Sequence, residues 1–257
     1  MFDLIDLSSC KESLDFTTII DWLSYKHKFK KEHPFYFNPD GLVVFTGAQG
    51  TGKTLSAVNY VEKLLKKYPK AKLVTNLTLK NYPIDNKRVF VFRNGEDLSR
   101  YKNGEFGVIF LIDEIQLYFN SLQSKNINPD VMVQISQQRK QRKHIVCTSQ
   151  VFGRLAKPLR EQFSSVIVCK NYFGFIQINK LVDRDSIDED MDSSDTVLKG
   201  QVKHRFLWFH NPKMYGKYDT YYVIRQNTFI SEEEKKLGIY GTENSVSLNF
   251  NSKEVKK

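Results

Sequence analysis

The sequence has few cysteines and no long apolar run. Its 257 residues include three cysteines, Cys10, Cys147 and Cys169, and none of them belongs to a C-x-x-C pair. Isolated thiols in odd number argue against a structural zinc site and a disulfide framework, and they favour a reducing compartment. The longest apolar runs, such as Leu42–Phe45 and Val108–Ile112, have the length of a strand and fall far short of the ~20 residues of a membrane helix.

The beginning of the chain lacks the basic segment and apolar run of an export signal, so we expect a protein that stays in the cytoplasm. A content of 40% hydrophobic and 26% charged residues, without repeats, is typical of a soluble globular protein and excludes a fibre or a wholly disordered chain. Lys and Arg number 39 against 29 Asp and Glu, which gives a net charge of +10. This charge indicates a polyanionic partner, nucleic acid or an anionic membrane surface, or it serves solubility alone.

Composition divides the chain into four parts. The expected parts are a helical lead-in (1–40), a core (41–170), a β-rich appendage (171–230) and a polar tail (231–257). The lead-in contains a basic run, Lys26–Lys31, which fits a solvated helix face or contact with a membrane or DNA. The appendage contains an acidic stretch, residues 183–192, which is expected to be an exposed loop.

The core alternates short apolar runs with helical stretches, which predicts βαβ units and a parallel sheet. Pro69 ends the first expected helix. The expected strands are 42–46, 72–79, 89–92, 108–112, 144–149 and 165–170, and the expected helices are 53–68 and 129–143. We therefore predict an α/β fold with a mainly parallel central sheet flanked by helices, followed by the small β-rich appendage.

One motif carries the functional prediction. The segment Gly47–Thr54, GAQGTGKT, fits the pattern G-x-x-x-x-G-K-[ST] at every fixed position, after an apolar strand and before a helix-forming run. Its glycines let backbone N–H groups approach phosphate closely, and the helix adds its positive dipole end. In this pattern Lys53 bridges the β- and γ-phosphates and the Thr54 hydroxyl is a ligand of Mg²⁺. The residues expected to bind ATP are Gly47, Ala48, Gln49, Gly50, Thr51, Gly52, Lys53, Thr54 and Leu55.

Two carboxylates, Asp113 and Glu114, follow the apolar run 108–112. At the carboxyl end of a parallel strand beside the phosphate-binding loop, Asp113 is placed to hold Mg²⁺. Glu114 is then placed to orient and deprotonate the attacking water, as the catalytic base. The pair predicts Mg²⁺-dependent ATP hydrolysis, and the alternative is a strand followed by a solvated acidic turn.

The expected strand 144–149 ends in polar residues, Thr-Ser-Gln. In P-loop ATPases with an extra strand between those of the loop and the carboxylates, a polar side chain at this position contacts the γ-phosphate and the water. Gln150 is the candidate for this role, and Ser149 is the next. A polar strand end without a catalytic role is the alternative.

Four arginines surround this strand, namely Arg139, Arg142, Arg154 and Arg160. A guanidinium that reaches the γ-phosphate of a neighbouring subunit would stabilise the charge of the transition state, and Arg142 is the candidate for this catalytic role. The basic cluster 138–143 equally fits a solvated helix end or a surface that follows a phosphodiester backbone.

These motifs resemble those of the zonular occludens toxin-like ATPases, the assembly proteins of filamentous phages, which are related to the FtsK/HerA-type pumping ATPases. The resemblance extends from Gly41 to Tyr222 and rests on GAQGTGKT, VIFLIDEIQ, the basic helix end before TSQ, and the late Tyr215-Gly-Lys-Tyr218. It implies a RecA-like core, a homo-oligomeric ring, and ATP-driven movement of phage DNA or virion components at the cell envelope. It assigns the family roles to Lys53, Thr54, Asp113, Glu114 and Gln150.

One feature departs from the family pattern. Filamentous-phage members generally have a membrane span after the ATPase domain, and this sequence shows none. We therefore expect a packaging or assembly ATPase in the cytoplasm of a bacterial host, docked at the inner membrane through a phage structural or envelope protein. Nothing in the sequence supports the toxin activity of the family's name.

Three other functions remain as alternatives or are set aside. A nucleoside kinase of the thymidine-kinase type also combines a GKT loop with Asp-Glu-x-Gln, as at Asp113–Gln116, but the scattered cysteines cannot build its zinc site. A GTPase requires Asn-Lys-x-Asp, and the segment Asn179–Asp183 is one residue too long. A scaffold that binds ATP without turnover stays open, although the intact carboxylates favour an enzyme.

Overall fold

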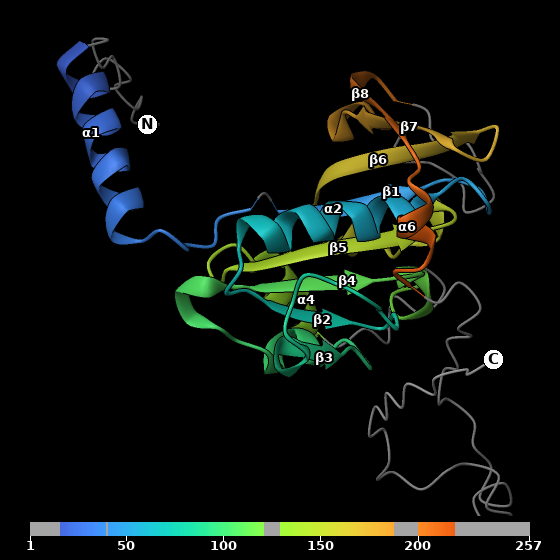
Figure 1. The fold of residues 1–257 in the computed structure, drawn as a ribbon, viewed down its shortest axis with the longest axis horizontal. Helices are drawn as coiled ribbons and strands as arrows, with labels where there is room; N and C mark the ends of the chain where they lie inside the picture. The colour runs from blue at the N-terminus through green and yellow to red at the C-terminus, as the bar shows by residue number, and fades with distance from the viewer. Residues whose placement is uncertain (1–15, 40, 121–128, 188–199, 219–257) are drawn as a thin grey trace, which may run out of the picture. The chain divides into compact units, whose positions relative to one another are not determined.

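The computed structural model describes residues 16–39, 41–120, 129–187 and 200–218, whose arrangement is shown in Figure 1. Within these residues, eight strands form one sheet in the order β3-β2-β4-β5-β1-β6-β7-β8. They are β1 (Leu42–Thr46), β2 (Lys72–Thr75), β3 (Val89–Val91), β4 (Val108–Ile112), β5 (Lys143–Ser149), β6 (Phe163–Tyr172), β7 (Ile176–Val182) and β8 (Val202–Phe209). The first six strands in this order, from β3 at the edge to β6, run parallel to one another. Strands β7 and β8 follow β6 and are antiparallel to their neighbours.

The inner strands β1 and β4 are buried along their whole length. A parallel strand that is covered on both faces needs apolar side chains at successive positions, and this explains the continuous runs LVVF and VIFLI. Both strands have the bounds that the sequence predicted.

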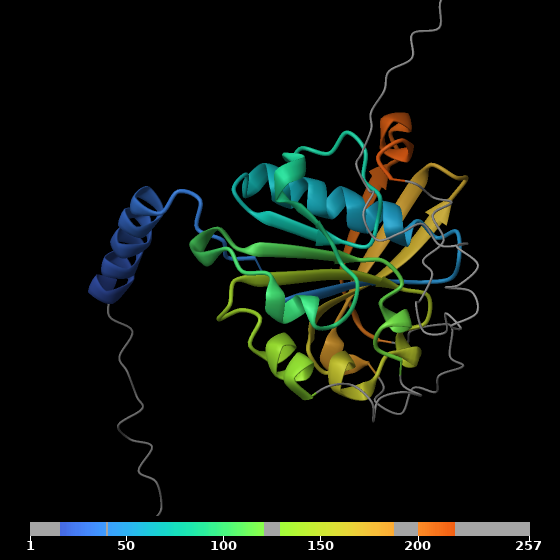
Figure 2. The same cartoon turned by 90° about the horizontal axis from the view of Figure 1, so that it is seen from below.

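Helices cover the two faces of the sheet (Figure 2). Helix α2 (Lys53–Lys67) lies on one face, where Ala57, Val61 and Leu65 join a buried cluster with Phe45 of β1. The other face carries α3 (Asp97–Arg100), α4 (Pro129–Ser136) and α5 (Lys157–Arg160) over a second buried cluster. The apolar residues of α2 recur at three- and four-residue spacing, so one face of the helix meets the sheet. This arrangement confirms the expected α/β fold with flanking helices.

The helix expected over residues 129–143 is shorter than predicted. Helix α4 ends at Ser136, and turns occupy residues 137–142. The hydroxyl of Ser136 donates to the carbonyls of Met132 and Val133, a local bond that is common where helices weaken. Arg142 then adopts a left-handed φ of 52°, and the chain enters β5 at the next residue.

The strand expected over residues 72–79 is also shorter, because β2 ends at Thr75. The hydroxyl of Thr75 accepts the N–H of Leu77 at 3.1 Å, which turns the chain out of the sheet. Asn76 therefore lies just after the end of β2, and its side chain takes part in the candidate site.

The boundary predicted between residues 170 and 171 falls inside β6, which pairs with β1 on one side and with β7 on the other. The division into a core and an appendage stays a prediction. In the acidic stretch 183–192, a short 3-10 turn covers Arg184–Ser186, and residues 188–192 lie outside the described residues, as does the tail 231–257.

The described part of the lead-in contains the helix α1 (Phe16–Glu32), which confirms its helical character. Most of its side chains are exposed, including Ile20, Trp22 and Leu23. A further short helix, α6 (Pro212–Tyr215), begins shortly after β8. In the part of the chain that the structure describes, no helix combines the length and the apolar character needed to cross a membrane.

Candidate nucleotide-binding site

The carboxyl ends of β1, β4 and β5 lie side by side at one edge of the sheet. Strand β5 is parallel to both neighbours, so that Thr46 pairs with Ser149 and Ile112 with Cys147. The segments that follow the three strands therefore leave the sheet at the same edge. The strand order confirms that one strand lies between those that lead to the loop and to the carboxylates.

The loop 47–52 joins β1 to α2 through turns and bends. Gly52 has a left-handed φ of 78°, and a Cβ atom on it would lie 2.2 Å from Oε1 of Gln177. Gly47 has a φ of 146°, and a Cβ there would lie 2.9 Å from the carbonyl oxygen of Cys169. Both positions therefore require glycine, for backbone conformation and for space.

The side chain of Lys53 is held inside the loop. Its Nζ donates to the carbonyl oxygen of Ala48 at 3.0 Å, and the residue is only 6% exposed. The hydroxyl of Thr51 donates to the same carbonyl at 2.7 Å. The first turn of α2 begins at Lys53 and buries Leu55 beneath it, so the backbone of this turn faces the loop with its N–H end. One ammonium group and a set of N–H donors thus converge where phosphate would bind.

Asp113 is the centre of a hydrogen-bond network. Its Oδ1 accepts the hydroxyls of Thr54 at 2.9 Å and of Thr148 at 2.6 Å. Burial raises the pKa of the Asp113 carboxyl, and these two hydrogen bonds offset part of the rise. The amide of Asn76 fixes the backbone of Asp113 from the other side, since it donates to the carbonyl at 2.9 Å and accepts the N–H at 2.8 Å.

Glu114 projects from a left-handed backbone position, with a φ of 52°. Its N–H donates to the hydroxyl of Thr148 at 2.9 Å, which ties the two carboxylate residues to β5. Its carboxylate accepts the side-chain amides of Gln150, at 3.3 Å, and of Gln116. The structure thus brings Gln150 and Glu114 together, as the sequence suggested, although the catalytic roles of these residues stay predictions.

The oxygens of Thr54 and Asp113 fit a magnesium ion. Mg²⁺ prefers hard oxygen ligands and is usually held by one or two protein groups together with phosphate oxygens and water. The hydroxyl and carboxylate oxygens, 2.9 Å apart, provide such a pair beside the loop. Across the described ranges, no group of three or more His, Cys, Asp or Glu side chains is arranged to hold a metal ion.

Arg142 does not join this group within its own chain. It precedes β5, and this seven-residue strand separates it from Gln150 by roughly 25 Å. Its guanidinium lies over the ring of Tyr36, 4.6 Å from the centroid. Arg139 lies at the same end of β5, whereas Arg154 follows the carboxyl end. A role of Arg142 in the site of a neighbouring subunit stays a prediction.

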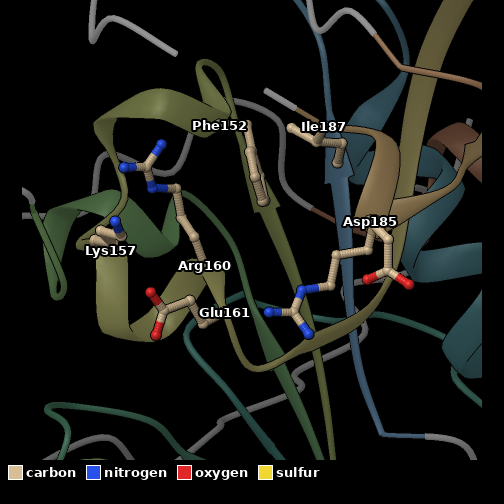
Figure 3. A pocket seen from close by; sticks show the side chains of 7 residues that line it. Phe152, Lys157, Arg160, Glu161, Asp185 and Ile187 are labelled. Atoms are coloured by element: carbon tan, nitrogen blue, oxygen red, sulfur yellow. The ribbon is translucent and has the colours of Figure 1, made fainter. Parts of the chain in front are cut away.

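Arg160 lies in a separate pocket, shown in Figure 3. The pocket is lined by Phe152, Lys157, Arg160, Glu161, Arg184, Asp185 and Ile187. Phe152 belongs to the buried cluster on the sheet face opposite α2, and the partly buried Ile187 packs against that cluster. The Nε of Arg160 is buried without a hydrogen-bond partner in the described structure. No residue of the loop lines this pocket, so Arg160 is also separate from the loop of its own chain.

Sequence reasoning missed two residues of the site, Asn76 and Thr148. Asn76 directly follows β2, and a polar residue at the end of a buried strand was the available signal. Thr148 lies inside β5 and is fully buried, so its pattern is that of a core residue. Its contact with Asp113, 35 positions away, follows only from the pairing of β4 with β5.

Comparison with solved structures finds similar folds at low identity. The N-terminal domain of zonular occludens toxin from Neisseria meningitidis is 16% identical, with a TM-score of 0.49 over 70% of this chain and 98% of that chain. The genome packaging NTPase of Sulfolobus turreted icosahedral virus 2, in complex with AMPPCP, is 17% identical, with a TM-score of 0.42 over 52% of this chain and 78% of that chain. The flagellar accessory protein FlaH from Methanocaldococcus jannaschii is 14% identical, with a TM-score of 0.39 over 55% of this chain and 77% of that chain.

Comparison of sequences gives a clearer result. No curated protein matches the chain. The family model described as zonular occludens toxin (Zot) matches residues 41–210, which extend from the start of β1 to just beyond β8 and make up more than half of the chain. The match confirms the resemblance that the motifs suggested. With a P-loop at the edge of a mainly parallel sheet and this match over the whole sheet, the chain belongs to the zonular occludens toxin family.

Proposed function

We propose that this protein is a Mg²⁺-dependent ATPase that acts as a phage-type motor in DNA packaging, DNA translocation or virion assembly. The observation that carries the proposal is the convergence of Lys53, the Thr54–Asp113 pair and Glu114 at one edge of the sheet. Membership of the zonular occludens toxin family supports the phage-type role.

Each residue has a stated task in this proposal. The loop N–H groups and Lys53 hold the β- and γ-phosphates of ATP, and Lys53 exchanges its bond to Ala48 for phosphate oxygens. Thr54 and Asp113 hold Mg²⁺, which when bound neutralises charge on the phosphates. Glu114 accepts a proton from the water whose oxygen attacks the γ-phosphorus, while the bond to the β-phosphate oxygen breaks.

Gln150 completes this arrangement as a positioning group. Its amide lies 3.3 Å from the Glu114 carboxylate, so it can hold the carboxylate and the attacking water in one orientation. A smaller rate loss is therefore expected from Gln150→Ala than from a change at Glu114.

We extend the proposal to the partners. The net charge of +10 and the family support a homo-oligomeric ring that acts on DNA. Such a protein would work in the cytoplasm of a bacterial host and would reach the inner membrane through a phage structural or envelope protein. An arginine, with Arg142 as the candidate, would reach the site of the next subunit in the ring.

The central test separates binding from hydrolysis. Lys53→Ala should abolish ATP binding, because it removes the ammonium group from the loop. Glu114→Gln should keep ATP binding and lower kcat by about 10²–10⁴-fold, the usual contribution of a general base. Glu161→Gln is the matched control, since this exposed carboxylate lies in the separate pocket, and it should hydrolyse ATP at the parental rate.

The same variants test the alternative function, a scaffold that binds ATP without hydrolysing it. A scaffold would bind ATP through Lys53, show no measurable hydrolysis in the parent protein, and be indifferent to Glu114→Gln. Absence of ATP binding by the parent protein with Mg²⁺ present would refute both functions.

DNA and the ring are tested separately. The ATPase rate is measured with single- and double-stranded DNA over a series of salt concentrations, because phosphate contacts make affinity fall steeply with salt. No binding and no stimulation at low salt would refute the DNA part. Sedimentation with and without ATP and Mg²⁺ tests the ring, and a monomer under both conditions would refute it.

A further inference from the structure

Gln177 of β7 lies directly beneath the phosphate-binding loop. The residue is fully buried, and its Nε2 donates to the carbonyl oxygen of Thr51 at 3.0 Å and to Oδ1 of Asn179 at 2.8 Å. Asn179 in turn donates to Ser56 of α2 at 3.1 Å. The side chain also fills the space that a Cβ on Gly52 would need. An antiparallel strand outside the parallel part of the sheet thus supports the loop.

The bond to Thr51 fixes one of the N–H groups of the loop. The carbonyl of Thr51 and the N–H of Gly52 belong to one planar trans peptide, so they point in opposite directions. Because Gln177 holds the carbonyl toward β7, the N–H of Gly52 points away from β7. Gln177 therefore controls the orientation of a donor in the segment that the motif assigns to phosphate.

The oxygen of the Gln177 side-chain amide faces His210. Nε2 of His210 lies 3.1 Å from Oε1 of Gln177, and Nδ1 lies 2.6 Å from the hydroxyl of Tyr215. The Oε1 of Gln177 can only accept, so His210 is the donor in the first bond. The hydroxyl of Tyr215 contacts Nδ1 of His210 and donates to the carbonyl oxygen of Gly174 at 3.0 Å. Burial lowers the pKa of His210. The bonds form a chain from the loop to Tyr215 in α6.

The residues after Tyr215 return to the elements around the loop. Lys217 forms an ion pair with Glu62 of α2, and its carbonyl accepts the N–H of Lys80 at 2.7 Å. Tyr218 bridges to Leu79 beyond β2. Figure 1 shows α6 next to α2, and contacts between the two helices agree with this view. The late Tyr-Gly-Lys-Tyr motif is thus connected to the loop both through α2 and through His210.

We propose that Gln177 is a positioning residue of the phosphate-binding loop, and that it transmits nucleotide binding from Thr51 through His210 to Tyr215. The proposal rests on nucleotide binding at the loop, as proposed above. When phosphate draws the loop N–H groups toward itself, the Thr51–Gly52 peptide turns, and the Gln177 amide and His210 follow it.

The chain contains a reporter for this movement. Trp208 of β8 pairs with Gln177, and its ring lies 4.8 Å from that of His210. The sequence has two tryptophans, so Trp22→Phe leaves Trp208 as the single tryptophan. We expect ATP with Mg²⁺ to change the emission of this protein in a saturable manner. Equilibrium dialysis with labelled ATP measures binding independently of the emission.

Gln177→Met in the Trp22→Phe background removes the hydrogen bonds and keeps the size of the side chain. We expect ATP to bind about tenfold more weakly, as for the loss of one buried hydrogen bond. At saturating ATP, we expect kcat within about twofold of the parent, because the chemistry itself needs no contact with Gln177. The Trp208 response at saturation should fall at least about fivefold, since a residue that only fills space would leave it unchanged.

Gln201→Leu is the matched control, since its exposed side chain has no hydrogen bond in the described structure and lies next to β8. It should preserve both ATP binding and the Trp208 response. If Gln177→Met does not fold, Tyr215→Phe replaces it, because this change removes one exposed hydroxyl from the far end of the chain of bonds. Tyr215→Phe should keep ATP affinity and reduce the Trp208 response.

A parent protein that binds ATP without a change in Trp208 emission would overturn the inference and leave the proposed ATPase intact. A full response in Gln177→Met, or in Tyr215→Phe where that variant is used, would overturn it as well. Loss of ATP binding in the parent itself, with Lys53→Ala no different, would instead refute the proposed function.

Discussion

Replacing Thr148 by valine should weaken the binding of Mg²⁺ and preserve the fold. Thr148 is fully buried, and its hydroxyl donates to Asp113 at 2.6 Å and accepts the N–H of Glu114 at 2.9 Å. Valine has nearly the same shape without the hydroxyl, so the carboxylate loses a donor and the N–H loses its acceptor. A buried polar group left without its partner costs about 1–3 kcal/mol, and we expect the free energy of unfolding to fall by that amount.

The effect on activity follows from the charge of Asp113. Burial raises its pKa, and the hydrogen bond from Thr148 is the first of those that lower it, so the pKa rises further in the variant. Mg²⁺ binds the ionised carboxylate, which is lost as the pH falls through this pKa. We therefore expect the Mg²⁺ concentration for half-maximal ATPase activity to rise about tenfold, equivalent to 1.4 kcal/mol. The acidic limb of the pH–activity profile should move to higher pH.

The assay is the steady-state ATPase rate as a function of Mg²⁺ at several pH values, with urea unfolding measured in parallel. Thr148→Ser is the control, because it keeps the hydroxyl and should behave nearly as the parent protein does. Equal Mg²⁺ requirements for the valine variant, the serine variant and the parent at every pH would show that the hydroxyl does not support Asp113, and the reasoning would be refuted.

Three further predictions concern the surroundings of the site. Gly52 has a φ of 78°, so Gly52→Ala should lower the free energy of unfolding by about 1–3 kcal/mol and abolish ATP binding. Calorimetry would measure the stability and dialysis the binding of ATP. A variant that is as stable as the parent and binds ATP would contradict this prediction. Lys217→Met should cost about 1–2 kcal/mol in urea unfolding. Burial raises the pKa of Glu62, but its lysine partners lower the pKa more, so that it lies below its ordinary value. The loss of stability in Lys217→Met should therefore be largest above the ordinary pKa of Glu62 and shrink as the pH falls. A loss of stability that does not depend on pH would contradict this prediction. Burial raises the pKa of Cys147, and raises that of Cys169 to about 12, so mass spectrometry after alkylation should find both unmodified until the protein unfolds.

The parts of the site that follow from neighbouring residues could be predicted from the sequence. The loop from Gly47 to Thr54 is one continuous motif, and β4 with Asp113 and Glu114 forms another. Each of these signals depends on local spacing, so that no knowledge of distant pairing was needed.

The residues that support the site depend on distant pairing instead. Asn76 and Asp113 are 37 positions apart, and Gln177 is 126 positions from Thr51. Their contacts require the complete sheet, and each residue alone has the pattern of an ordinary core or strand-end position. The predicted end of α4, at residue 143, was also wrong. Residues 137–142 are polar enough for an exposed helix, and nothing in the sequence indicates that the chain must turn at Arg142 in order to enter β5.

The position of β1 in the sheet has a consequence for synthesis of the chain. Both of its neighbours, β5 and β6, are made roughly 100 residues later, so β1 leaves the ribosome without a partner. Until then the apolar strand LVVFT is exposed to other nascent chains or to chaperones. Slow translation between residues 47 and 143 would lengthen this interval, and fragments that end before β6 should aggregate when they are expressed.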